Sequence, residues 1–113
     1  MIIQKNTEFF KSISTAPIVS KPFPNSAADT LSLQISGDFT SGKFHIEGRN
    51  NSRGDWVSLA AIDLSDFSPV RGGFTKAGMY ELSIVGVREI RARVESVSGN
   101  ASMFGQMIST EET

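Results

Sequence analysis

Apolar and polar residues alternate with a period of two through much of the chain. In 31–36, Leu, Leu and Ile alternate with Ser, Gln and Ser, and similar runs cover 43–48, 79–85, 87–97 and 101–109. Successive side chains of a strand point to opposite faces of the sheet. Each run therefore predicts a strand with one buried face and one face toward solvent.

Turn-forming residues separate these runs. The sequence predicts turns at 37–42, at the polar stretch 49–55, at 76–78, at Gly86 and at 98–100, and a loop over 62–73. A strand that opens on Trp56 follows the polar turn. Short strands at such spacing are typical of small all-β folds. We expect an all-β antiparallel sandwich, jelly-roll or immunoglobulin-like, of about seven or eight strands.

The N-terminal part lacks the regular alternation of the rest of the chain. Its apolar residues follow no clean period, and Pro17, Pro22 and Pro24 interrupt any regular element. We divide the chain into an N-terminal arm (1–28), a sandwich domain (29–109) and a frayed tail (110–113). The arm is expected either to begin with a short helix at 7–12 or to be extended. It lies across its own sheet or across that of a neighbour.

Composition narrows the functional classes. With 113 residues, 39% of them hydrophobic, the chain is long enough for one core. A formal net charge of −1 gives no basis for nucleic-acid binding. The chain has no cysteine, so thiolate metal sites and disulfides are excluded. No signal peptide or membrane-spanning segment is expected, and no cofactor is predicted.

No catalytic group stands out. His45 is the only histidine, and alternation places it on the solvent face with Lys43 and Glu47. Asp55, Asp63 and Asp66 lack the ligand spacing of calcium loops and fit turn roles. Arg53-Gly54-Asp55 fits a hairpin turn better than an adhesion motif. We therefore expect a protein that is not an enzyme and binds no metal.

Two surface features leave alternatives open. Arg91 and Arg93 share a strand face with Glu95, as in a solvated strand with weak ion pairs or in a charged subunit interface. Trp56 is either a core anchor or a platform for a sugar ring. In the second case a glycan would contact Trp56, Asn50, Asn51 and Arg53.

The series of strands as a whole carries a resemblance. The segments LSLQISG (31–37), FHIEG (44–48), DWV (55–57), GMYEL (78–82) and VREIRARV (87–94) resemble those of small bacteriophage virion proteins. In that class a β-sandwich module serves in head decoration proteins, head fibres, and tail or neck accessories. The match covers about residues 30–108, and Arg49-Asn50-Asn51 makes the polar turn longer than the usual one. Discoidin-like carbohydrate-binding modules share a similar turn.

The resemblance implies a non-enzymatic virion protein, made in the host cytoplasm and carried on the particle. Its partners would be capsid, neck or tail subunits, and further copies of the chain in a homo-oligomer. The alternative is a carbohydrate-binding module that recognises a cell-surface glycan. The residues expected at the assembly interface are Ile2, Ile3, Phe9, Phe10, Arg91 and Arg93.

Overall fold

The computed structural model describes the backbone of residues 2–25 and 27–110, and all regular structure in these ranges is β. The strands are β1 (Ile2–Ile13), β2 (Ile18–Val19), β3 (Phe23–Pro24), β4 (Thr30–Arg49), β5 (Val57–Ser58), β6 (Ala61–Asp63), β7 (Ser68–Val70), β8 (Gly78–Ser83) and β9 (Glu89–Thr110). Every strand pair is antiparallel. The predicted all-β, antiparallel class is confirmed. Within the described ranges, no helix is long and apolar enough to cross a membrane.

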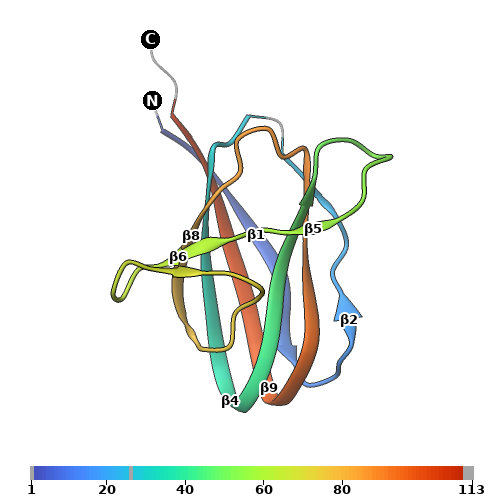
Figure 1. Cartoon of the computed structure of the whole chain (residues 1–113), viewed down its shortest axis with the longest axis vertical. Coiled ribbons are helices and arrows are strands. Elements are labelled where there is room, and N and C mark those ends of the chain that lie inside the picture. Colours follow the sequence, from blue (N-terminus) through green and yellow to red (C-terminus); the bar gives the residue numbers. More distant parts are fainter. Residues whose placement is uncertain (1, 26, 111–113) are drawn as a thin grey trace.

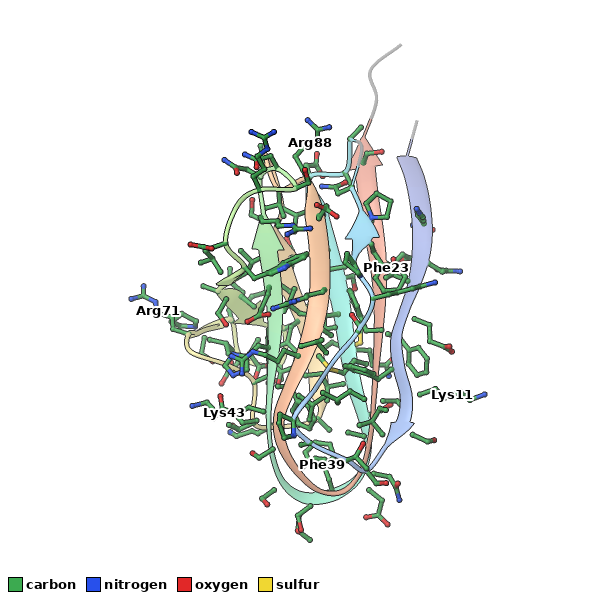
Figure 2. The ribbon with its side chains drawn as sticks, turned by 90° about the vertical axis from the view of Figure 1, so that its right-hand side faces the viewer. Lys11, Phe23, Phe39, Lys43, Arg71 and Arg88 are labelled. Atoms are coloured by element: carbon green, nitrogen blue, oxygen red, sulfur yellow. The ribbon has the colours of Figure 1, made fainter. Side chains whose placement is uncertain are left out.

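Two long strands form the frame of the molecule. β4 and β9 pair along their whole lengths, from Thr30 opposite Ile108 to Arg49 opposite Glu89. Both strands turn back at the lower end of the molecule in Figures 1 and 2, so the ribbon that they form is bent into a U. The two arms of the U are the two layers of a sandwich.

Shorter strands widen each layer. The path through the sheet is β1-β9-β4-β8-β6-β7. The first layer contains β1, β8 and the parts of β4 and β9 at 30–36 and 101–110. The second layer contains 44–49 of β4 and 89–94 of β9, with β2 and β3 along β9 and β5 along β4. One continuous sheet thus supplies both faces of the core.

Glycines occur where the ribbon bends. Gly37 and Gly99 have φ of 129° and 117°. Residues other than glycine rarely adopt this backbone conformation. A Cβ on Gly37 would also lie 2.9 Å from the Cα of Ala101, and one on Gly99 would lie 2.7 Å from the Cα of Phe39. The turns predicted at 37–42 and 98–100 are therefore wrong. The same glycines that favour a turn here let two strands bend together without a break.

The core fills the space between the arms. Its fully buried side chains come from both layers: Leu31, Leu33, Ile35, Phe44, Ile46, Phe74, Leu82, Ile84, Ile90, Val94 and Met103. These are the residues that the alternation placed inward on each predicted strand, with Phe74 added from a loop. Phe39 lies at the bend, at the opposite end of the molecule from Arg88 (Figure 2).

The N-terminal segment belongs to the sheet. β1 pairs with β9 from Ile2 opposite Thr110 to Ile13 opposite Ala101. The segment is extended rather than helical, and it lies against its own sheet, which decides both alternatives. A bulge between Glu8 and Phe10 lets two neighbouring aromatic rings, Phe9 and Phe10, both turn inward, and they are 6% and 8% exposed.

The stretch after the polar turn also differs from expectation. The strand predicted from Trp56 is short, since β5 holds only Val57 and Ser58. The loop predicted over 62–73 contains a small hairpin of β6 and β7. Asx turns close the tip of this hairpin, where Asp63 and Asp66 accept hydrogen bonds from the backbone and hydroxyl groups of Ser65 and Ser68.

Candidate functional site

A ladder of charged residues covers the outer face of the second layer. Its three cross-strand pairs are His45 with Arg93, Glu47 with Arg91, and Arg49 with Glu89. In each pair one residue comes from β4 and the other from β9. Glu95 of β9, Trp56 and Ser58 complete the set. We call these nine residues the charged ladder.

Glu47 is the centre of the charged ladder. Its Oε1 accepts a hydrogen bond from the Nε of Arg91 at 2.8 Å, and its Oε2 accepts one from the Nε of Arg93 at 2.9 Å. The Glu47 side chain is only 8% exposed. Burial raises the pKa of Glu47, but the hydrogen bonds and charges of Arg93 and Arg91 outweigh burial and hold it below the ordinary value.

Trp56 lies against two of the arginines. The guanidinium carbons of Arg49 and Arg91 are 4.3 and 4.4 Å from its ring centroid. Such contacts are cation–π interactions, each worth about 0.5–1 kcal/mol at partly exposed sites. Trp56 is therefore neither a core anchor nor a free platform, because it is a half-buried cover over the charged ladder.

His45 joins three strands. Its Nδ1 lies 2.9 Å from the Oγ of Ser58, and its Nε2 lies 2.9 Å from the Oε1 of Glu95. It is only 5% exposed, so the predicted solvent position is wrong. β5 pairs with this edge of β4, and the Gly73 backbone is so close that a Cβ there would lie 2.9 Å from the imidazole Cε1.

The His45 contacts have the order of a nucleophile, a base and an orienting carboxylate. The hydrogen bond from His45 holds the pKa of Glu95 below its usual range, so the carboxylate accepts from Nε2–H. In the neutral imidazole, Nδ1 then accepts a hydrogen bond from the Ser58 hydroxyl group. The same bonds also fasten β5 to the ribbon, which is the structural role of this cluster.

The residues expected at an assembly interface are separated. Arg91 and Arg93 are half-buried and paired with Glu47, and their role in a subunit interface stays a prediction. The rings of Phe9 and Phe10 are in the core and leave little area for a neighbouring subunit. The side chains of Ile2 and Ile3 lie outside the described residues.

The four residues expected to touch a glycan make contacts in two separate groups. Asn50, Asn51 and Arg53 are exposed in the polar turn. The amide of Asn51 donates to the Asn50 side chain and its oxygen accepts from the backbone of Arg53. Trp56 instead contacts Arg49 and Arg91, so a glycan contact at the turn stays a prediction.

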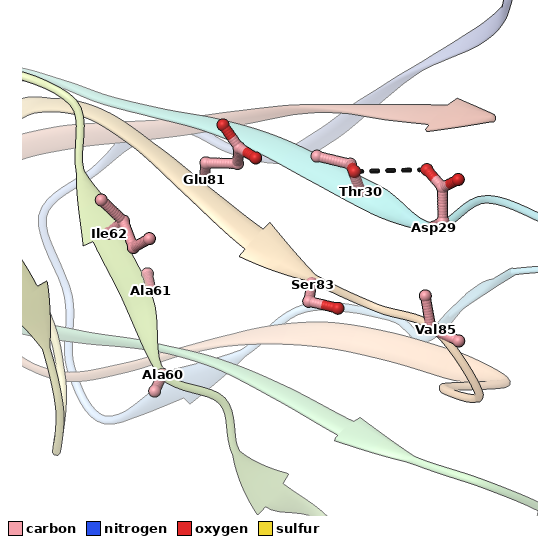
Figure 3. Close-up of a pocket in the computed structure, with 8 residues that line it drawn as sticks. All are labelled: Asp29, Thr30, Ala60, Ala61, Ile62, Glu81, Ser83 and Val85. Atoms are coloured by element: carbon pink, nitrogen blue, oxygen red, sulfur yellow. Dashed lines mark hydrogen bonds between the residues drawn. The ribbon is translucent and has the colours of Figure 1, made fainter. Parts of the chain in front are cut away.

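An open groove of about 560 Å³ lies on the outer face of the first layer, where β6 crosses β8 (Figure 3). The residues that line it are Asp29, Thr30, Ala60, Ala61, Ile62, Glu81, Ser83 and Val85. The hydroxyl of Thr30 donates to Asp29 at 3.2 Å. Two smaller depressions lie further along the same face, on either side of Phe104.

Sequence reasoning missed Phe67. This ring is 78% exposed at the tip of the β6–β7 hairpin, and its backbone has φ of 58°. Its N–H donates to the carbonyl of Asp63, and the Asx turns on both sides hold the tip in shape. The Asp and Ser spacing gives a signal for the turn, but nothing in it indicates that the aromatic ring points outward.

Metal ligands do not gather in the described part of the chain. Within 2–25 and 27–110, no group of three or more His, Asp or Glu side chains could hold an ion.

The bent ribbon, the single core and the charged ladder define a small all-β module in which one antiparallel sheet is folded on itself. Two solved structures share this fold. SPBc2 prophage-derived protein YomS superposes with a TM-score of 0.86 at 21% identity, over 96% of both chains. PBSX exported protein XepA superposes with a TM-score of 0.83 at 17% identity, over 96% of this chain but 38% of its own.

The sequence model of the XepA family matches residues 5–107, so the chain belongs to the XepA family. It spans about 38% of the length of PBSX XepA itself. A search of curated proteins found no match. The prophage origin named for YomS agrees with the bacteriophage part of the resemblance. Neither structure is named as a head, fibre or tail protein.

Proposed function

We propose that this chain is a non-enzymatic structural protein of a phage particle. The observation that carries the proposal is its end-to-end likeness to a prophage protein, since the fold covers 96% of both chains. This likeness of the whole fold to a prophage protein supports a role in a phage. The partners would be other virion subunits, including further copies of this chain in a homo-oligomer.

The interface that we propose is centred on Phe67. An aromatic ring that is exposed and held in one position by its backbone is suited to be the anchor residue of an interface. Phe67 has a backbone conformation that costs about 1 kcal/mol or more, and four hydrogen bonds from Ser65 and Ser68 maintain the turn around it. Hydrogen bonds from Ser68 lower the pKa of Asp66, so the tip also presents a carboxylate. A partner would offer an apolar socket with a basic rim.

A place on the particle also agrees with the fact that PBSX XepA is an exported protein. A subunit made in the host cytoplasm and attached to the particle leaves the cell with it. Arg91 and Arg93 would then act within the fold, as supports of the charged ladder.

The test is attachment to particles. Phe67→Ala should keep the fold, because the ring is 78% exposed, and should reduce the amount of protein on purified particles at least about tenfold. Val57→Ala is the matched control, since Val57 is 60% exposed on β5 of the other layer. Equal attachment of wild type and Phe67→Ala contradicts the proposed interface.

A second experiment tests the absence of enzyme activity. A fluorophosphonate probe reacts with an activated serine, so it would label Ser58 if the Ser58–His45–Glu95 contacts formed a catalytic site. The proposal predicts that the probe does not label Ser58, so the wild type and Ser58→Ala should give the same signal. Labelling that depends on both Ser58 and His45 would make the chain an enzyme.

A further inference from the structure

The proposed function does not use the outer face of the first layer. Its side chains form three rows across the strands, set by the strand register. The rows are Glu8, Phe104, Gln34 and Met79; Asn6, Gln106, Ser32, Glu81 and Ile62; and Gln4, Ile108, Thr30 and Ser83. All three depressions described above lie on these rows.

Phe104 divides the face. A depression of about 380 Å³ lies on its β1 side against Asn6 and Glu8, and one of about 210 Å³ lies on its β4 side against Gln34 and Met79. Gly105 borders both depressions, and its own side-chain position faces the core, where a Cβ would lie 2.8 Å from the Phe9 ring. A half-buried aromatic ring with hollows on both sides offers its edge and faces to a ligand that crosses the strands.

The chemistry of the rows is that of amides and hydroxyls. Gln106 donates to the oxygens of Gln4 at 3.4 Å and Asn6 at 3.2 Å, which links the three amides across β1 and β9. Each amide both donates and accepts, as vicinal hydroxyl groups require. The charged members of the three rows are the carboxylates Glu8 and Glu81, and none is a lysine or arginine.

We infer that this face binds an uncharged, extended glycan chain. Apolar faces of sugar rings pack on aromatic side chains, and their hydroxyl groups hydrogen-bond with side-chain amides. Neighbouring strands are about 4.8 Å apart, close to the length of one pyranose unit in an extended chain, so successive sugars would meet successive strands. The carboxylates disfavour anionic polymers such as nucleic acids or polysaccharide sulfates. The glycan follows the middle row from Asn6 toward Glu81, with Phe104 beside it.

The inference is independent of the virion role. It differs from a contact at the polar turn, because Trp56 and Asn51 belong to the other layer and its turn. The two sites predict different variants: Phe104→Leu and Gln34→Ala impair the sheet-face site, whereas Asn51→Ala does not. Phe104→Leu keeps an apolar side chain in place of the ring, and Gln34 is exposed, so both variants should fold.

The experiment uses the full chain and three soluble probes. Chitohexaose and cellohexaose are the uncharged probes, and dextran sulfate is the anionic one, with binding measured by calorimetry and by NMR shifts. We expect one of the uncharged probes to bind, Phe104→Leu to lose at least about tenfold in affinity (about 1.4 kcal/mol), and Gln34→Ala to lose several-fold. Asn51→Ala should bind as the wild type does.

Three results would overturn the inference. The first is that neither uncharged probe binds at millimolar concentration. The second is that Phe104→Leu and Gln34→Ala both bind the probe as the wild type does, and the third is that dextran sulfate binds as tightly as the uncharged probes. If Phe104→Leu instead loses attachment to particles while no glycan binds, the face is a protein interface. If Phe67→Ala reduces attachment to particles and Phe104→Leu does not, the result supports the virion role and leaves the glycan site to the binding measurements.

Discussion

Gly37 of β4 and Gly99 of β9 each lie against the backbone of the opposite strand at the bend. Gly37 contacts Asn100 and Ala101, and Gly99 contacts Asp38 and Phe39, with no room for a Cβ on either glycine. Because both strands bend at the same level, the two arms of the ribbon can close on one core. This pair of close approaches produces the sandwich from a single sheet.

Alanine at either glycine should therefore destabilise the fold. Gly37→Ala and Gly99→Ala each combine an unfavourable φ with a backbone clash, and we expect a loss of about 2–4 kcal/mol in the free energy of unfolding in urea. Gly72→Ala is the control: its φ of 74° is also unfavourable, but nothing lies within 4 Å of the added Cβ. That variant should lose only about 1 kcal/mol. Equal losses in all three would mean that the close approach at the bend contributes nothing.

Glu47 should make stability depend on acid. The folded pKa of Glu47 is lowered, so the folded state holds this proton less tightly than the unfolded state does. Its contribution is fully present above the ordinary glutamate pKa of about 4.3 and is lost as the pH falls through the folded value. Glu47→Gln should lower the free energy of unfolding by about 2 kcal/mol at neutral pH, because it leaves two arginines without their carboxylate.

The matched control for Glu47→Gln is Glu81→Gln, a change at an exposed carboxylate of β8. Unfolding in urea between pH 3 and pH 7 should show a shallower acid slope for Glu47→Gln, and the wild-type slope for the control. If Glu47→Gln keeps the full slope, the pairs with Arg91 and Arg93 do not supply it.

Trp56 reports directly on the charged ladder, since it is the only tryptophan in the chain. The ring is half-buried, and two guanidinium groups lie within 4.4 Å of its centroid. Relative to its quenching of free N-acetyltryptophanamide, iodide should therefore quench this fluorescence more strongly than caesium does, because the arginines attract the anion. Arg49→Gln should reduce this difference. Equal quenching by both ions would place the ring away from the arginines.

Thr7 offers a route to higher stability. Its hydroxyl oxygen is the one buried side-chain polar atom without a hydrogen-bond partner in the described residues, and Thr7 is 3% exposed. A buried hydroxyl without a partner costs about 1–3 kcal/mol. Thr7→Val keeps the shape and should raise the free energy of unfolding by about 1 kcal/mol. Thr75→Val, at an exposed position, should leave it unchanged.

The alternation of side chains was enough to predict the inward faces of the strands. Leu31, Ile46 and Ile90 are all fully buried, as their positions indicate. The bend could not be predicted, because glycine is equally suited to a reversal of the chain and to a close approach of two strands. The pairing of β1 with β9 could not be predicted, because the bulge between Glu8 and Phe10 breaks the period of two.

The burial of residues on the outer face could not be predicted from the alternation. His45 and Glu47 are on the outer face that alternation gives them, yet both are buried. Their cover comes from β5, Trp56 and the Gly73 loop, which lie on the same strand edge only after folding. Burial of this kind depends on distant contacts, so a local pattern cannot show it.

The central claim is that the chain is a structural part of a phage particle. The most direct measurement is quantitative mass spectrometry of gradient-purified particles from a host that encodes the chain. We expect the protein at a fixed ratio to the major capsid subunit, retained through repeated gradients and reduced at least about tenfold by Phe67→Ala. Its presence only in the soluble lysate, with none on intact particles, would contradict the account.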